Sequence, residues 1–205
     1  WSTHFDGTGD SIVVPSQATG NSEFTLGANQ FCFELWLKNE RAAGTNQLIL
    51  EPRTTTTGVA YYDGVYLNLG GDNSRQFRFR DGNDDTNIAI SSTQIDDSKW
   101  FHLVVTRDSS NYVRLFVDGN LEDYELDAGS FDYVGNLRFG ARVSDLAVPF
   151  LGKISNFRLT IGSIPTNYAT SETSANTQVF TPPTTPITSV TDYGATADDV
   201  KSILF

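Results

Sequence analysis

Alternation of apolar and polar residues dominates the chain up to about residue 160. In residues 31–38, FCFELWLK, every odd position is large and apolar, whereas Glu34, Trp36 and Lys38 stand at even positions. Side chains of a strand alternate between its two faces, so this pattern predicts a strand with one face in a core. The same pattern recurs in residues 65–69, 77–80, 113–117 and 137–139. Apolar residues at helical spacing are missing from windows of comparable length, so we expect few and short helices.

Turn signals separate the predicted strands. Asp118-Gly119 stands between two apolar runs and is typical of a two-residue hairpin turn, because both residues accept a positive φ. Residues 100–107, WFHLVVTR, are apolar on both faces, as in a central strand covered on each side. Ile154 and Phe157 are three positions apart in an alternating stretch, which predicts a bulge. The spacing of strands and turns predicts an all-β protein, a two-sheet antiparallel jelly-roll sandwich.

The composition changes after Ile161. Residues 162–199 are rich in Thr, Ser, Ala, Asn and Pro, and little alternation survives there. We therefore divide the chain into a sandwich over residues 1–161 and a Thr/Ser/Pro-rich tail over residues 162–205. The tail is expected to pack on the sandwich or on a neighbour, with Val179-Phe180 as its apolar anchor and a final edge strand over residues 200–205.

Length and charge narrow the possible partners. The chain has 205 residues, enough to bury a core without a disulfide or a metal, and a net charge of −11. This acidic balance disfavours nucleic acid and anionic membrane surfaces as partners. Its apolar runs are too short for membrane insertion, and the lone Cys32 excludes an intrachain disulfide or a thiolate metal cluster. Because Met is absent, we expect a processed chain or part of a longer one.

Five segments, taken together, resemble a known family. Residues 5–15 (FDGTGDSIVVP), 31–38, 100–107, 113–119 and 150–159 (FLGKISNFRL) follow one another in the order and spacing of concanavalin A-like, laminin G-type domains. The resemblance covers the first 161 residues. It implies a jelly roll of two curved antiparallel sheets, neighbouring termini, and recognition of glycans or proteins at the rim or the concave face.

The tail resembles that of one particular variant of this family. Residues 180–187, FTPPTTPI, are similar to the variant of this domain in large structural proteins of marine bacteriophages, cyanophages in particular. That similarity implies an extracellular location on a virion surface, within a homo-oligomeric assembly. The first functional hypothesis is a non-enzymatic binding module of a tail fibre, appendage or capsid decoration that recognises host cell-surface glycan. The second is an architectural domain that contacts neighbouring virion subunits and binds no glycan.

An enzyme is the third and most distant hypothesis, because glycoside hydrolases share this fold. Such enzymes need a pair of carboxylates in one cleft, which a Glu-x-Asp-x-x-Glu or Glu-x-Asp-x-Glu run on one strand supplies. Glu125 and Asp127 match the start of such a run, but Gly129 and Ser130 stand where its second Glu is needed. Glu122 cannot replace that Glu, because it falls on the opposite face from Glu125. We therefore predict no catalytic residues and no enzymatic activity.

Two reactive side chains lie inside predicted strands. His102 is surrounded by apolar residues and has no Ser or Cys motif beside it, so we interpret it as a packed histidine rather than a base. Cys32 is interpreted as packed and inert.

Glycan binding needs an aromatic platform beside planar polar groups. Sugar rings present C–H faces and hydroxyl groups together, and amphipathic aromatic side chains match both. The candidates are the outward or turn-adjacent residues Trp36, Tyr61, Tyr62, Tyr66 and Arg78.

These candidates have structural alternatives. Trp36 and Phe116 would equally fill a second layer of the sandwich. The outward arginines, which include Arg78, Arg80 and Arg114, would either engage acidic glycans or a neighbouring subunit, or pair with acidic residues of the same surface.

One turn carries hard oxygen ligands at alternate positions, as calcium loops do: Asp81, Asn83 and Asp85. We assign these three as candidate Ca²⁺ ligands, although the turn lacks the Gly and the closing Glu of an EF-hand. Asp6 and Asp10 form a second candidate. In both places the alternative is ordinary turn chemistry.

Overall fold

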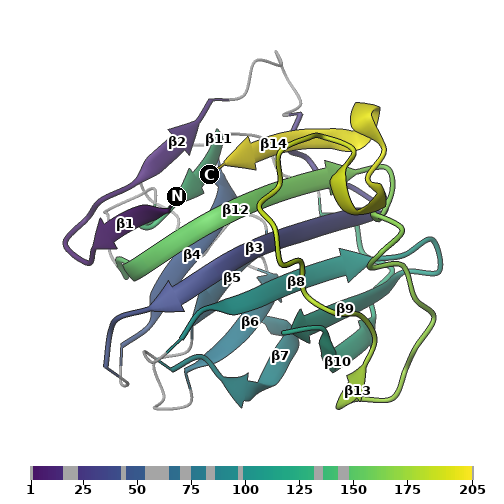
Figure 1. The fold of residues 1–205 in the computed structure, drawn as a ribbon, viewed down its shortest axis with the longest axis horizontal. Coiled ribbons are helices and arrows are strands. Elements are labelled where there is room, and N and C mark those ends of the chain that lie inside the picture. The colour runs from purple at the N-terminus through teal and green to yellow at the C-terminus, as the bar shows by residue number, and fades with distance from the viewer. Residues whose placement is uncertain are drawn as a thin grey trace.

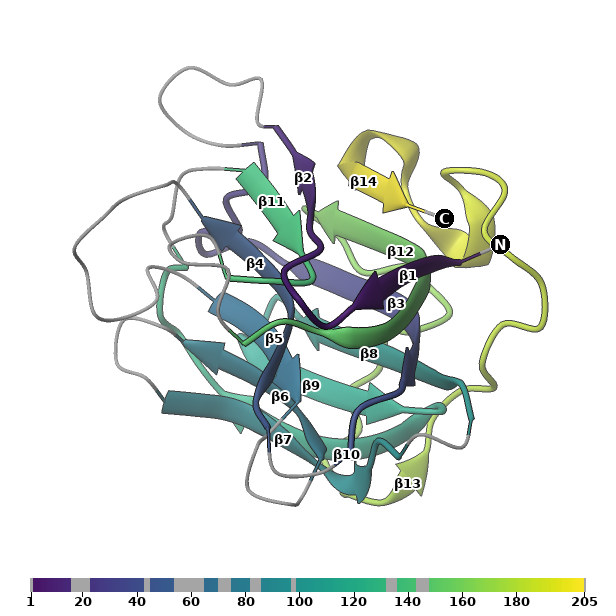
Figure 2. The ribbon, with the colours of Figure 1, turned by 90° about the vertical axis from the view of Figure 1, so that its left-hand side faces the viewer.

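Two antiparallel β-sheets lie face to face and enclose a large apolar core (Figures 1 and 2). The computed structural model describes residues 2–15, 23–42, 45–53, 65–69, 75–81, 86–96, 99–131, 136–142 and 148–204. Within these ranges the backbone alone is described for residues 52, 53, 65–68, 81 and 202–204. The predicted two-sheet antiparallel sandwich is confirmed.

Within the residues that the structure describes, the larger sheet has eight strands. Their spatial order is β1 (Thr3–Asp6), β12 (Leu151–Ile161), β3 (Phe31–Asn39), β8 (Phe101–Arg107), β9 (Tyr112–Val117), β10 (Asn120–Leu126) and β13 (Thr177–Gln178), with β14 (Val200–Leu204) also pairing with β12. β1 pairs with residues 151–154 of β12 and β14 with residues 157–160, so two terminal strands lie along one edge. The two termini therefore lie near each other (Figures 1 and 2), as the family resemblance implied.

The smaller sheet, with six strands in the described ranges, lies behind the larger one in Figure 1. Their order is β2 (Ile12–Val14), β11 (Asn136–Phe139), β4 (Gln47–Arg53), β5 (Val65–Leu69), β6 (Gln76–Asp81) and β7 (Thr86–Gln94). Two short 3₁₀ helices, η1 (Asp192–Gly194) and η2 (Ala197–Asp199), precede β14. In the described ranges, neither length nor apolarity qualifies any helix to cross a membrane.

The inward residues of the two sheets meet as the alternation predicts. Phe31 and Phe33 of β3 pack on Phe79 of β6, with ring centroids 5.8 and 6.3 Å apart. Phe77 and Phe79 are fully buried, and both belong to the core between the sheets. Tilted ring pairs at such distances stabilise a core beyond the area that they bury.

β8 is covered on both faces, as its apolar character predicts. All seven of its residues are buried. Leu103 and Val105 face the core between the sheets, whereas Val104 belongs to a second apolar cluster on the outer face of the larger sheet. The tail supplies much of that cluster through Tyr168 and Phe180. Residues 162–199 thus lie over the larger sheet (Figure 1).

Two predicted local features are confirmed. Asp118 and Gly119 have φ values of 50° and 83°, which fits the predicted hairpin turn between β9 and β10. In β12 the pairing register with β3 shifts between Ser155 and Arg158, and Asn156 has a φ of 51°. This is the bulge indicated by the three-residue spacing of its apolar positions.

The turn at Gly119 also packs against the tail. A substitution at Gly119 should therefore destabilise both the turn and the attachment of the tail. The Val179 amide donates a hydrogen bond to the Gly119 carbonyl oxygen (2.9 Å), and a Cβ at Gly119 would lie 1.9 Å from the Phe180 carbonyl oxygen. We expect Gly119→Ala to lower the free energy of unfolding by about 1–3 kcal/mol. Urea denaturation measures this loss, and limited proteolysis reports whether the tail is displaced.

Gly129→Ala is the matched control for Gly119→Ala. A Cβ at Gly129 would approach only the side chain of Asp127, at 2.9 Å. Equal stability and equal proteolysis of the two variants would contradict the role of Gly119 in seating the tail.

Candidate functional site

A groove of about 770 Å³ lies on the outer face of the larger sheet, beside the tail. This volume falls within the range of small-molecule sites. The groove is lined by Ser2, Trp36, Trp100, Ser155, Asn156, Thr181, Pro182, Pro183, Thr184, Thr185 and Pro186. Its residues therefore come from both ends of the chain and from the middle of the sheet, and no acidic or basic side chain is among them.

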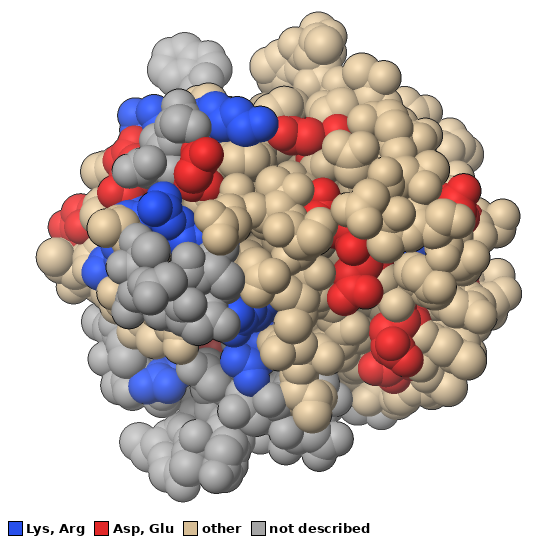
Figure 3. Space-filling view, turned by 90° about the horizontal axis from the view of Figure 1, so that it is seen from below, with Lys and Arg blue, Asp and Glu red and all other residues tan. Residues whose placement is uncertain are grey.

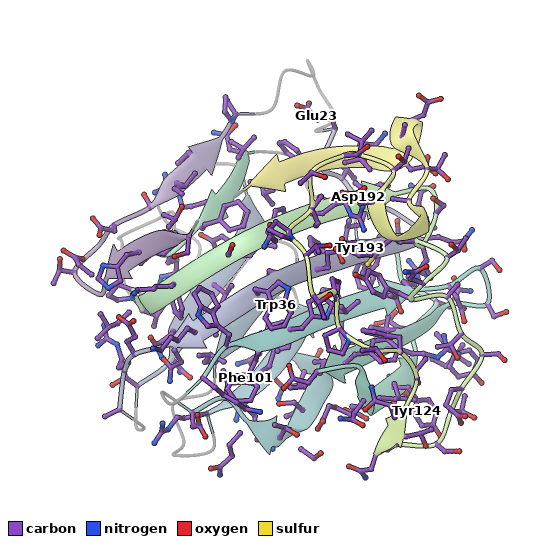
Figure 4. The ribbon with its side chains drawn as sticks, in the orientation of Figure 1. Glu23, Trp36, Phe101, Tyr124, Asp192 and Tyr193 are labelled. Carbon is purple, nitrogen blue, oxygen red and sulfur yellow. The ribbon has the colours of Figure 1, made fainter. Side chains whose placement is uncertain are left out.

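β3 positions Trp36 at the groove. The neighbouring Leu35 and Leu37 are buried in the core, so Trp36 points to the outer face, where it stays partly exposed. In register, Ser155 of β12 lies on one side of it and His102 of β8 on the other. The Trp36 and His102 ring centroids are 5.1 Å apart. Trp36 is thus held by its strand and by a buried ring, and Figure 4 places it near the middle of this face.

The tail forms a wall of the groove and is held on both sides of it. Before the wall, Phe180 packs on Tyr168 and Phe116, with centroids 4.8 and 5.3 Å apart. After the wall, the Tyr193 hydroxyl donates a hydrogen bond to the Thr185 carbonyl oxygen (2.5 Å). The wall, residues 181–186, contains three prolines, whose rings fix φ.

A buried polar cluster lies under the tail. Glu34 and Arg158 form an ion pair in which each side chain is 1% exposed. The Arg158 Nη1 group also donates a hydrogen bond to the carbonyl oxygen of Asp192 in η1 (2.6 Å), so this cation joins the sheet to the tail. Burial raises the pKa of Glu34, and the charge of Arg158 opposes that rise.

The two reactive side chains in the strands are packed, as predicted. His102 is 2% exposed, with its Nε2 atom 3.9 Å from Glu34 Oε2. Burial, with the charge of Arg158 acting in the same direction, lowers the pKa of His102 to about 3. The ring is therefore neutral near pH 7. Cys32 is also buried, and burial raises the pKa of its thiol, which keeps the sulfur from ionising to the nucleophilic thiolate.

The acidic residues of β10 serve the fold. The buried Glu122 carboxylate accepts hydrogen bonds from the Ser92 and Thr93 amides at 2.9 and 2.8 Å. Asp123 accepts one from the Ile90 amide (2.9 Å), so both carboxylates bind the edge strand β7 of the smaller sheet. Glu125, by contrast, is exposed. Glu122 is thus engaged in joining the two sheets.

The structure separates the predicted glycan-binding residues. Trp36 lines the groove on the outer face of the larger sheet. Arg78 lies on β6 between the buried Phe77 and Phe79, and so belongs to the outer face of the other sheet. Tyr61 and Tyr62 lie outside the described residues, as does the side chain of Tyr66, whose backbone is in β5.

Trp100 was not among the predicted site residues. It stands two positions before His102, which places its side chain on the same outer face as Trp36. That alternation was a usable signal in the sequence. The position of the wall at residues 181–186 had no such signal, because nothing local fixes where a tail without alternation comes to lie.

For Phe116 and Arg114 the structure supports a structural role, as second-layer packing and as an ion pair respectively. Phe116 is fully buried under Phe180, so it fills a second layer, which the tail provides. Arg114 is also buried, with Nη1 2.5 Å from Asp108 Oδ2 and Nε donating to the Glu172 carbonyl oxygen (2.8 Å). Burial alone would raise the pKa of Asp108, but hydrogen bonds, the largest from Arg114, lower it.

The calcium prediction is not tested by the described residues. Asp81 ends β6, while its side chain, Asn83 and Asp85 lie outside them. In the second candidate turn, Asp6 Oδ1 accepts hydrogen bonds from the Thr8 amide and hydroxyl at 2.8 and 2.7 Å, and Asp10 accepts one from the Asp6 amide. The described part of the chain contains no group of three or more His, Cys, Asp or Glu residues placed to hold a metal ion.

Several solved structures share this fold at low sequence identity. One is a Bacteroides ovatus protein described as a candidate carbohydrate-binding protein (14% identity, TM-score 0.58), with 80% of this chain aligned to 44% of that one. Another is the CBM40 of the Ruminococcus gnavus IT-sialidase, bound to α2,3-sialyllactose (13%, TM-score 0.54), with 77% of this chain and 94% of that one aligned. Domains LG4-5 of the mouse laminin α1 chain match at 18% identity and a TM-score of 0.54, over 89% and 47% of the two chains.

The sequence itself carries the family assignment. A search of curated proteins found no match to this chain. The family model described as the concanavalin A-like lectin/glucanases superfamily matches residues 6–161, from β1 to the end of β12. The groove therefore combines strands of the matched domain with a wall that lies beyond the match. Since the matched region exceeds half of the chain, the protein belongs to the concanavalin A-like lectin/glucanases superfamily.

Proposed function

We propose that the protein is a non-enzymatic carbohydrate-binding module whose ligand lies in the groove at Trp36. The observation that carries the proposal is the combination of Trp36 and Trp100 with Ser155 and Asn156 in one open groove. Indole faces stack on the C–H faces of a pyranose, and the hydroxyl and amide groups beside them match its hydroxyls. The sialyllactose bound by the Ruminococcus gnavus module and the description of the Bacteroides ovatus protein as a candidate carbohydrate-binding protein support this class of ligand.

We further propose that this module is extracellular, displayed on a virion surface in a homo-oligomeric assembly, and recognises host glycan. The support is the similarity of residues 180–187 to phage structural proteins. An architectural domain without glycan binding is the second candidate. In one version of this candidate, the tail would extend onto a neighbouring subunit. That version is less favoured, because Phe180 of the tail packs on the larger sheet of the same chain.

The Trp36→Ala variant tests the glycan site. We expect saturable binding of the intact chain to at least one class of oligosaccharide on a glycan array, and a loss of at least tenfold in affinity for Trp36→Ala. The reason is that the stacking face is removed while the buried neighbours remain. Isothermal titration with the array hit measures the loss. Adding EDTA in a parallel titration shows whether the proposed Ca²⁺ contributes.

Tyr124→Ala is the control for Trp36→Ala. Tyr124 is a partly buried aromatic residue of β10 outside the groove lining (Figure 4). Equal loss of affinity in both variants would show a general effect on folding. Absence of binding to every glycan in multivalent format would overturn the proposed function and leave the architectural candidate.

A further inference from the structure

A row of basic side chains borders the groove on the outer face of the larger sheet. In the strand register His4 of β1 is opposite Lys153 of β12, and Lys153 is opposite Lys38 of β3. All three point outward, because their neighbours Phe5, Ile154 and Leu37 are in the core. We call His4, Lys153 and Lys38 the basic row.

The basic row lies one step along the strands from the floor of the groove. Lys38 is two residues from Trp36 on β3, and Lys153 is two residues from Ser155 on β12. Residues two apart on a strand share a face and are separated by about 7 Å. A sugar stacked on Trp36 would therefore place a substituent at one end of its ring within reach of the Lys38 ammonium group.

The cation nearest Trp36 in this row is available to a ligand. Glu40 is shared by the other two members, 3.0 Å from His4 Nε2 and 3.7 Å from Lys153 Nζ. Within the described part of the chain, the Lys38 ammonium group has neither a hydrogen-bond nor an ion-pair partner. A lysine stem is flexible, and its ammonium group is a compact charge suited to a carboxylate or a sulfate group.

This arrangement contrasts with the charge of the whole chain. The net charge is −11, yet none of the residues lining the groove is acidic. Figure 3 shows the two charges unevenly spread: Lys and Arg lie mainly on the left of that view, with some Asp and Glu among them, whereas the charged side chains on the right are nearly all Asp and Glu. A short basic row beside an uncharged groove can attract a single anionic group. A polyanion would extend over the surrounding acidic surface and be repelled by it.

We propose that the groove binds a glycan containing an anionic monosaccharide, with its ring on Trp36 and its carboxylate or sulfate group on Lys38. Lys153 and His4 border the same end, where the Glu40 carboxylate offsets part of their charge and leaves the Lys38 ammonium group as the cation for the ligand. This inference rests on the proposed function, since it names the class of sugar that the groove takes.

Matched oligosaccharides test the inference. The probes are a galactose oligosaccharide, the galacturonic acid oligosaccharide of the same length and linkage, and the 6-O-sulfated galactose oligosaccharide. We expect at least one anionic probe to bind the intact chain ten times more tightly than the neutral probe at low salt. The difference should shrink at 0.5 M NaCl, because salt screens an exposed charge pair. The galacturonate and sulfate probes distinguish the two sources of negative charge.

Two variants separate the possible outcomes. Lys38→Gln should bring the affinity of the preferred anionic probe down to that of the neutral probe, whereas Lys201→Gln, which removes the same charge on β14, should leave the preference intact. Equal binding of neutral and anionic probes, or a preference that survives Lys38→Gln, would overturn this inference while leaving carbohydrate binding in place. Binding of none of the probes nor of any array glycan would overturn both.

Discussion

Replacing Arg158 with Met is expected to lower the free energy of unfolding by about 3–5 kcal/mol at pH 7. The reason is that Glu34 and Arg158 are both buried, so the substitution leaves the Glu34 carboxylate without its partner in a water-poor site. It also removes the hydrogen bond to the Asp192 carbonyl oxygen, which holds the tail near η1. Urea denaturation followed by tryptophan fluorescence measures the loss.

The loss of free energy of unfolding in Arg158→Met should be larger at neutral pH than in acid. Burial already raises the pKa of Glu34 above its ordinary value of 4.5, and without Arg158 only the hydrogen bond from Tyr168 still opposes that effect. A folded-state pKa above the unfolded one means that the cost appears as the pH rises beyond about 4.5 and fades below it. The difference between Arg158→Met and the original chain should therefore be smaller at pH 4 than at pH 7.

A double variant separates the buried charge from the lost packing. Glu34→Leu combined with Arg158→Met removes both charges, so it should recover at least half of the stability lost in Arg158→Met. If the double variant is less stable than Arg158→Met, the unpaired carboxylate is not the cause of the loss. Arg138→Met, on the partly exposed surface of β11, is the control for a simple change of Arg to Met.

The second large expected effect is a fall in the free energy of unfolding in mild acid, because His102 is protonated in the unfolded chain but stays neutral in the folded one. The folded pKa of His102 is about 3, against an ordinary value of 6.5, so the unfolded chain takes up a proton that the folded chain does not. The stability tied to His102 is present above pH 6.5 and is lost as the pH falls from 6.5 towards 3. At 1.36 kcal/mol for each pKa unit, the loss is on the order of 2–3 kcal/mol at pH 4.5.

Two measurements check this behaviour. Urea denaturation between pH 7.5 and 4.5 should show a smaller decline for His102→Gln than for the original chain. In proton NMR, the His102 ring signals should stay unshifted over the same range, and the signals of His4 are identified by their loss in His4→Gln. A His102 ring that titrates near pH 6.5 would contradict the burial on which this prediction rests.

The alternation of apolar and polar residues was enough to predict most of the sandwich, since it encodes which face of each strand enters the core. It did not predict β4 and β7. Residues 86–94 of β7 contain only a short apolar stretch, and amides of this edge strand bond to Glu122 and Asp123 of β10 rather than to a further strand. No alternating pattern signals such side-chain partners.

The candidate site was less predictable than the sheets. Alternation marked Trp36 and Arg78 alike as outward, but it carries no information on which sheet, or which side of the molecule, a strand will occupy. Only the pairing of β3 with β12 and β8, and of β6 with β5 and β7, placed the two residues on opposite faces.

The sequence by itself determined the fold class, the family, the hairpin at Asp118-Gly119, the bulge in β12 and the outward position of Trp36. Each of these depends on residues within one strand or turn, where steric and hydrophobic preferences act locally. The tertiary structure alone decided that Phe116 would be buried while Trp36 remained open. Both are outward aromatic residues, and what separates them is the path of the tail, which is fixed by Phe180 on the sheet and by Arg158 at Asp192. These long-range contacts depend on the whole assembled surface, and no local pattern encodes them.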